Sequence, residues 1–136
     1  MSGNLDRLKA AYKAWHDSKG GSQQAWLDIM SDSVVIRSTG APVQALAFAG
    51  HRHSKEGAVA YMTSLLGTWS MVHWTPETFV ESGDRIAVFA TCGWTNKATG
   101  KTAEVRIAHL WQFKDGKIAS LDEIFDTGAA IAAATP

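Results

Sequence analysis

The chain has 136 residues, of which 46% are hydrophobic and 19% are charged. Its 13 basic and 13 acidic residues give a formal net charge of zero, which argues against a nucleic-acid partner or an anionic membrane surface because both attract a basic patch. The single cysteine, Cys92, excludes an internal disulfide and is typical of a reducing compartment. No segment has the apolar length of a signal peptide or a membrane span, so we expect one cytoplasmic domain over residues 1–136.

The first half of the chain predicts three helices and one strand. Helices are expected over 4–19, 23–30 and 54–66, because apolar residues recur there at helical spacing. Each of these segments also begins at or just after a side chain that could cap a helix. A short strand is expected over 34–39. The stretch 40–53, between this strand and the third helix, has no clear period and could cover part of the molecule.

The second half predicts four long strands joined by turns. Two of them cover 69–81 and 85–95, and Pro76 favours an edge position or a bulge for the first. The other two form a hairpin within 103–127, and the small residues after it are weakly helical. This order predicts an α+β domain in which a curved antiparallel sheet wraps over three N-terminal helices.

The hairpin AEVRIAHLWQFKDGKIASLDEIFDT can form in two registers. A two-residue turn would pair Lys114 with Lys117, whereas a three-residue loop with Gly116 as a bulge would pair Phe113 with Lys117. A one-residue slip moves every side chain to the other face of a strand. We favour the three-residue loop because it separates apolar from polar side chains, which the other register mixes.

The favoured register places His109 and Glu123 as diagonal neighbours on an otherwise apolar face. Two titratable groups in such surroundings must pair, contact water in a cavity or shift their pKa values. One interpretation is a satisfied structural pair in a closed core. The other is that both side chains line a pocket.

Aromatic residues are expected on the same inner face. Trp15, Trp74, Trp94 and Trp111 are predicted to point inward together with Cys92. Each could simply belong to the core, but several beside a polar pair would form a flat apolar slot for an aromatic ligand. We interpret Cys92 as a small hydrophobic residue because no base or helix N-terminus is expected near it.

Two further groups of charged or metal-binding side chains have open interpretations. Arg37 on the first strand is either a surface charge or an anchor for an anion at the mouth of the pocket. His51 and His53 lie in a loop without further ligands, which is weak evidence for a metal. We therefore expect no metal site.

Several segments resemble the nuclear transport factor 2-like superfamily, in particular its SnoaL-like and ketosteroid-isomerase-like branch. They are DIMSDSVVI, AFAGHRHSKEGAVAYM, ESGDRIAV, ATGK and AHLWQFKDGKIASLDEIFD. The resemblance implies a cone-shaped, cystatin-like barrel with a pocket between sheet and helices. It also implies a homodimer through the outer face of the sheet, where Phe89, Leu110, Ile118 and Ile124 could supply apolar patches.

Only some of the functional residues of these enzyme families have counterparts in this chain. Ketosteroid isomerases use a carboxylate base with an oxyanion hole of a tyrosine and a protonated aspartate. Tyr12 and His109 fall at the two oxyanion positions, but Ser38 falls at the base position, so steroid isomerisation is not expected. Limonene-epoxide hydrolases use an Asp-Arg-Asp triad. In this chain Glu123 would stand in for one carboxylate of that triad, and the other two members are missing. SnoaL-type cyclases rely on an acid/base carboxylate in this closing strand, a role that Glu123 suits.

We therefore expect a small-molecule pocket protein that acts on an apolar or aromatic substrate by acid–base chemistry without a cofactor, as a lyase, isomerase, cyclase or hydrolase. Glu123 would move a proton, with its pKa raised by the apolar pocket, while His109 orients it or donates to an oxyanion and Tyr12 adds a hydrogen bond. The alternatives are a non-catalytic binder of a hydrophobic ligand and a dimerisation module whose pocket is filled by its own side chains.

Overall fold

The computed structural model describes residues 3–39 and 43–136. Its α-helices are α1 (Gly3–Asp17), α2 (Gln23–Leu27), α3 (Ser54–Thr68) and α4 (Thr127–Ala134), and a 3-10 turn, η1, covers Gln44–Leu46. Its strands are β1 (Met30–Ser38), β2 (Arg52–His53), β3 (Trp69–Ser82), β4 (Arg85–Asn96), β5 (Thr102–Lys114) and β6 (Lys117–Phe125). None of the described helices is long and apolar enough to cross a membrane.

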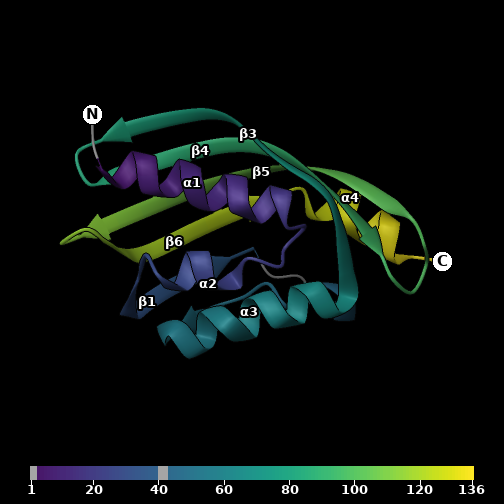
Figure 1. The fold of residues 1–136 in the computed structure, drawn as a ribbon. Coiled ribbons are helices and arrows are strands. Elements are labelled where there is room, and N and C mark those ends of the chain that lie inside the picture. The colour runs from purple at the N-terminus through teal and green to yellow at the C-terminus, as the bar shows by residue number, and fades with distance from the viewer. Residues whose placement is uncertain (1–2, 40–42) are drawn as a thin grey trace.

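The strands form one curved sheet in the order β2-β1-β6-β5-β4-β3. Helices α1, α2 and α3 lie on one side of this sheet, and α4 lies at the end of the molecule near the C-terminus (Figure 1). The predicted α+β class, with a curved sheet over three N-terminal helices, is confirmed. The sheet is mixed, however, because β1 pairs with β6 in parallel while the neighbouring pairings are antiparallel.

The second helix is shorter than its apolar pattern predicts. It ends at Leu27, and Met30, predicted to be its last residue, is already the first residue of β1. The reason is the sheet: the backbone N–H of Ile118 on β6 donates to the carbonyl of Ile29 and draws this segment into an extended conformation. A local helical period cannot compete with a ladder formed by a distant strand.

Strand β3 satisfies both predictions for Pro76. It is an edge strand of the sheet, and its register shifts between Pro76 and Thr78. A proline has no backbone N–H to give to a ladder, so an edge or a bulge is where it is tolerated.

The hairpin turn differs from the predicted three-residue loop. Lys114 pairs with Lys117, and both Asp115 and Gly116 have positive φ angles, 51° and 78°. This is the pattern of a two-residue type I′ turn, whose twist matches that of the flanking strands. The predicted register was therefore wrong at the turn.

A bulge then restores the predicted separation of faces. Ala119 has no partner between the pairs Phe113–Ile118 and Gln112–Ser120. The extra residue returns the following apolar positions of β6 to the inner face, as a bulge does. The predicted apolar face was right because an extra residue in the loop and a bulge on β6 each shift the register by one residue, and a shift in either direction gives the same alternation of faces.

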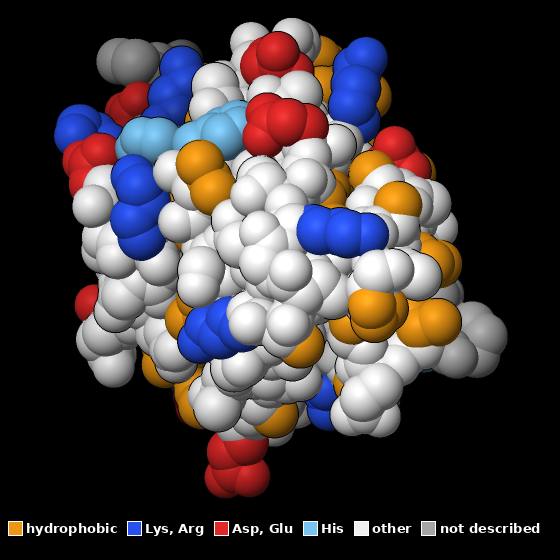
Figure 2. All heavy atoms as spheres, turned by 90° about the vertical axis from the view of Figure 1, so that its right-hand side faces the viewer, with side chains coloured by type: hydrophobic (Ala, Val, Ile, Leu, Met, Phe, Trp, Pro, Cys, Tyr) orange, Lys and Arg blue, Asp and Glu red, His pale blue; other side chains and the backbone are white. Residues whose placement is uncertain are grey.

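The core lies between the inner face of the sheet and the helices, and the outer face keeps exposed apolar side chains. Phe89, Leu110 and Ile124 are 48%, 41% and 64% exposed, whereas Ile118, predicted beside them, is fully buried. Ile118 lies before the bulge and pairs with the buried Phe113, so its side chain points inward. At the end of the molecule that carries the C-terminus, apolar side chains are scattered among charged and polar ones (Figure 2).

Candidate active site

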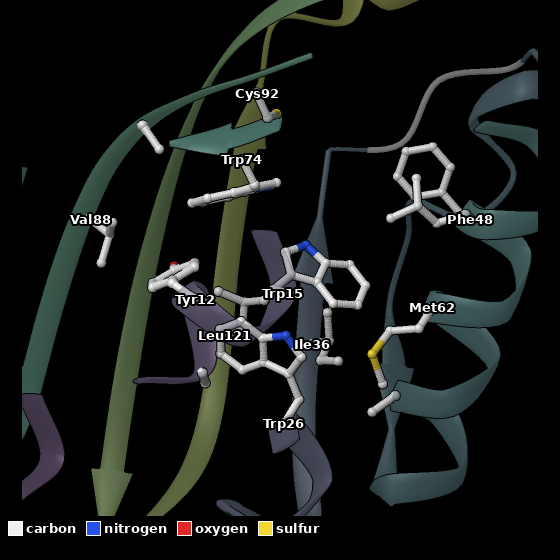
Figure 3. Close-up of a cluster of buried hydrophobic side chains, with 14 of the residues drawn as sticks. Tyr12, Trp15, Trp26, Ile36, Phe48, Met62, Trp74, Val88, Cys92 and Leu121 are labelled. Atoms are coloured by element: carbon white, nitrogen blue, oxygen red, sulfur yellow. The ribbon is translucent and has the colours of Figure 1, made fainter. Parts of the chain in front are cut away.

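A cavity of about 100 Å³ lies between the inner face of the sheet and the helices. The predicted inward-facing residues Trp15, Trp74, Cys92, Trp94 and Trp111 all line it. Other lining residues include Tyr12, Trp26, Phe48, Tyr61, Met62, His109, Leu121 and Glu123. Phe48 and Met62 face the tryptophans Trp15 and Trp26 across this cluster (Figure 3). The surroundings are therefore mostly apolar, with a few polar groups in the wall.

His109 and Glu123 are directly opposite each other on β5 and β6 rather than diagonal. The imidazole Nε2 lies 2.6 Å from the Glu123 Oε2, and the two side chains are only 8% and 5% exposed. Strand alternation turns both toward the cavity, and the bulge at Ala119 brings them level. The structure thus unites the two residues that the sequence analysis singled out.

Tyr12 connects this pair to α1. Its hydroxyl lies 2.5 Å from His109 Nδ1 and accepts a hydrogen bond from the Trp111 indole N–H at 2.8 Å. Its ring also stacks on that of Trp74, with the centroids 4.6 Å apart. Helix α1 therefore contributes both a hydrogen bond and an aromatic wall to the site.

The hydrogen bonds of Tyr12 determine the protonation of His109. The indole N–H of Trp111 is only a donor, so Tyr12 must accept from it and must donate its own proton elsewhere. The remaining partner is His109 Nδ1, which is then an acceptor, so the Nε2 nitrogen carries the proton and donates it to Glu123. A proton on Nδ1 would instead leave the buried Tyr12 hydroxyl without an acceptor.

Two hydroxyl groups complete the surroundings of Glu123. Ser38 on β1 donates to Oε1 at 2.6 Å, and Tyr61 on α3 donates to the same oxygen at 2.5 Å. Ser38 thus stands at the position of a ketosteroid isomerase base but acts as a hydrogen-bond donor. The carboxylate is held from three elements of the fold.

Sequence reasoning missed Tyr61. The buried face of α3 runs through Ala58, Met62 and Leu65, whereas Val59 is 37% exposed. Tyr61 lies beside this face. Its spacing from Ala58 and Leu65 was a usable signal, because positions three and four apart share one side of a helix.

The pKa of Glu123 is lower than its ordinary value, which corrects the expectation of a raised pKa. Burial on its own raises the pKa, but the hydrogen bond from His109, the charge that His109 carries when protonated, and the hydrogen bonds from Ser38 and Tyr61 stabilise the charged form and outweigh it. The apolar pocket that we expected to keep the proton on Glu123 also holds three donors. The carboxylate is therefore ionised near neutral pH.

The two tyrosines and the cysteine of the cavity stay protonated. Burial raises the pKa of Tyr12 and of Tyr61 well above the ordinary value, and the Glu123 charge raises both further. Burial also raises the pKa of the Cys92 thiol to about 12. Its Sγ lies 3.8 Å from the Val105 carbonyl, so Cys92 behaves as a small buried residue.

Arg37 does not line the cavity. It follows the inward-facing Ile36 on β1, so alternation places it on the outer face, where it binds the Asp122 carboxylate at 2.5 Å. The prediction of a pocket residue is wrong for this position, and the surface alternative holds. Within the described residues, no group of three or more His, Cys, Asp or Glu side chains is arranged to hold a metal ion.

Comparisons with known proteins agree with this architecture. An NTF2-like protein of unknown function from Burkholderia pseudomallei is 23% identical with a TM-score of 0.83, and each chain covers 100% of the other. TerC co-crystallised with polyporic acid is 25% identical with a TM-score of 0.78, covering 97% of this chain and 98% of its own.

A hypothetical protein with a ketosteroid isomerase-like fold from Catenulispora acidiphila, solved in complex with trimethylamine, is 16% identical with a TM-score of 0.74 and covers 93% of both chains. A search of the curated proteins found no match. The sequence model of the SnoaL-like domain matches residues 8–121. That span runs from within α1 to within β6, and the chain belongs to the SnoaL-like domain family.

Proposed function

We propose that the protein is an enzyme that moves a proton on a small, mainly apolar substrate bound in the cavity, with Glu123 as the base. The observation that supports this most is an ionised carboxylate in the wall of an apolar cavity, held by three donors. A fixed charge in water-poor surroundings interacts with a reacting group more strongly than it would in water.

The surrounding residues have distinct roles in this proposal. His109 is a positioning residue, because its Nε2–H fixes one carboxylate oxygen, and Tyr12 keeps His109 in the required tautomer. Tyr61 lines the cavity beside the other oxygen. Once Glu123 has taken a proton, it needs fewer donors, and the Tyr61 hydroxyl becomes available to an oxyanion on the substrate.

Similar structures support a small-molecule role without fixing the substrate. The structure of TerC contains polyporic acid, and the protein from Catenulispora acidiphila contains trimethylamine. The cavity in this chain, at about 100 Å³, is smaller than the roughly 150 Å³ space that accepts benzene in a protein core. It suits a compact substrate, and an aromatic one requires side chains to move.

The test is deuterium exchange of small enolisable ketones in D₂O, followed by NMR. We expect the protein to accelerate exchange and the Glu123→Gln variant to lose at least about 100-fold of that acceleration, the usual contribution of a general base. Glu104→Gln, an exposed carboxylate on the outer face, is the matched control and should exchange like the parent. Equal exchange by the parent and Glu123→Gln would refute the role of Glu123.

Non-catalytic binding is the second candidate, because each polar atom of the Tyr12–His109–Glu123 network already has a partner. A protein that binds a compact ligand but accelerates no exchange would support this candidate over the enzyme.

We also propose a homodimer through the outer face of the sheet. Exposed Val80, Phe89, Leu110 and Ile124 lie there on four neighbouring strands, and apolar side chains in such numbers on one face favour association. Light scattering should give a dimer that Phe89→Glu converts to monomer; a monomeric parent protein would refute it.

A further inference from the structure

The hydrogen-bonded network in the cavity ends on a buried carboxylate. Donation runs from the Trp111 N–H to Tyr12, from Tyr12 to His109 and from His109 to Glu123. The chain of donors ends on the Glu123 carboxylate, whose pKa lies below its ordinary value. One unit of negative charge is therefore buried at the wall of the cavity.

His109 is the only basic side chain among the described residues that line the cavity. The lining contains neither lysine nor arginine. Arg37, on the neighbouring strand, points to the outer face and binds Asp122. A buried charge without a counter-charge is costly, and the cost falls when an opposite charge arrives.

Glu123 also has room for one more hydrogen bond. A carboxylate offers about four acceptor positions on its two oxygens. Ser38 and Tyr61 use two positions on Oε1, and His109 uses one on Oε2. One position on Oε2 remains for a donor on a ligand.

Aromatic rings form much of the wall of the cavity that this carboxylate lines. Trp15, Trp26, Trp74, Trp94 and Trp111 line the same cavity. The faces of aromatic rings carry partial negative charge, and tryptophan attracts cations most strongly of the three aromatic side chains. Rings of this kind also accept methyl groups, so they suit an alkylated cation better than a bare ion.

We infer that the cavity recognises a small alkylated ammonium group, which places its N–H against Glu123 and its methyl groups against the tryptophans. The size agrees, because a trimethylammonium group has four heavy atoms and the cavity of about 100 Å³ is smaller than one that holds benzene. The inference rests on the proposed function in one respect: it names the chemical class of the substrate for the same site.

The probe is trimethylammonium chloride near neutral pH, followed by isothermal calorimetry and by tryptophan fluorescence. The comparison ligand is tert-butanol, a neutral molecule of similar shape. We expect trimethylammonium to bind at least tenfold more tightly than tert-butanol. Glu123→Gln, which keeps the side-chain size, should remove that preference, while Glu104→Gln should retain it.

The outcomes separate this inference from the proposed function. Equal binding of the two ligands, or a preference that survives in a folded Glu123→Gln variant, overturns the ammonium inference. Glu123-dependent exchange on ketones without trimethylammonium binding leaves the enzyme proposal in place and removes the inference. Selective trimethylammonium binding without any exchange supports the ammonium inference and removes the enzyme proposal. Circular dichroism shows whether each variant is folded.

Discussion

The two faces of the sheet each carry a histidine–glutamate pair, and their comparison shows what burial contributes. On the inner face, His109 and Glu123 are 2.6 Å apart and almost fully buried. On the outer face, His73 Nε2 lies 2.8 Å from a Glu104 oxygen, with side chains 25% and 66% exposed. The distances are alike, so geometry alone does not distinguish a candidate active-site pair from a surface pair.

What differs is the number of groups that depend on each carboxylate. Glu123 is the acceptor for His109, Ser38 and Tyr61, each of which has little access to water. Glu104 accepts from His73, and water can replace either partner. An inner-face substitution therefore leaves several buried donors unsatisfied, whereas an outer-face substitution leaves none.

The largest expected effect comes from truncating the two carboxylates. Glu123→Ala should lower the free energy of unfolding by about 3 kcal/mol or more, because three buried donors lose their acceptor. Glu104→Ala should change it by less than about 1 kcal/mol, as for exposed ion pairs. Urea denaturation measures both, and comparable losses in the two variants would contradict the distinction between the faces.

An intermediate effect is expected from acid. The pKa of Glu123 is depressed in the folded protein, so its contribution to stability is present above the unfolded value of about 4.3 and is lost as the pH falls through the folded pKa. The free energy of unfolding should therefore fall more steeply below about pH 4.3 in the parent protein than in Glu123→Gln. Urea titrations at several pH values test this. Parallel curves for the two proteins would show that Glu123 is not held by its donors.

The smallest expected effect is at Gly93, which lies on β4 beneath the outer pair. A Cβ atom there would stand 2.5 Å from Glu104 Oε2 and 2.8 Å from the His73 ring. Gly93→Ala should therefore separate this pair while changing the free energy of unfolding by less than about 1 kcal/mol, because exposed side chains can swing into water.

The measurement for Gly93→Ala is the NMR signal of each histidine ring. The His73 signals should shift, and those of His109 should stay in place. A loss of several kcal/mol would mean that the outer pair supports the fold after all.

The face of each strand was predictable, but the exact register was not. Alternation of apolar and polar residues placed His109 and Glu123 together, because burial of one face is a local property of the sequence. The turn was wrong because a three-residue loop and a two-residue turn followed by a bulge at Ala119 give the same alternation beyond the bulge. The pattern therefore reports the face of each residue but not its partner, and beyond the bulge the two arrangements differ by two residues.

Contacts between distant segments were the least predictable. The parallel pairing of β1 with β6 and the bond from Tyr61 to Glu123 join parts of the chain whose local patterns say nothing about each other. The same limit explains the pKa of Glu123. Its apolar neighbours and His109, whose contact lowers the pKa most, were visible in the sequence, whereas the further donors on β1 and α3 were not.

The parallel pairing of β1 with β6 has a consequence for synthesis on the ribosome. Ser38 and its acceptor Glu123 are 85 residues apart, which corresponds to roughly 4 to 17 s of translation at common elongation rates. Throughout that interval β1 lacks its neighbour, and the nascent chain presents an unpaired strand edge and an apolar inner surface. We therefore expect chaperones to bind the growing chain until β6 has emerged from the ribosome.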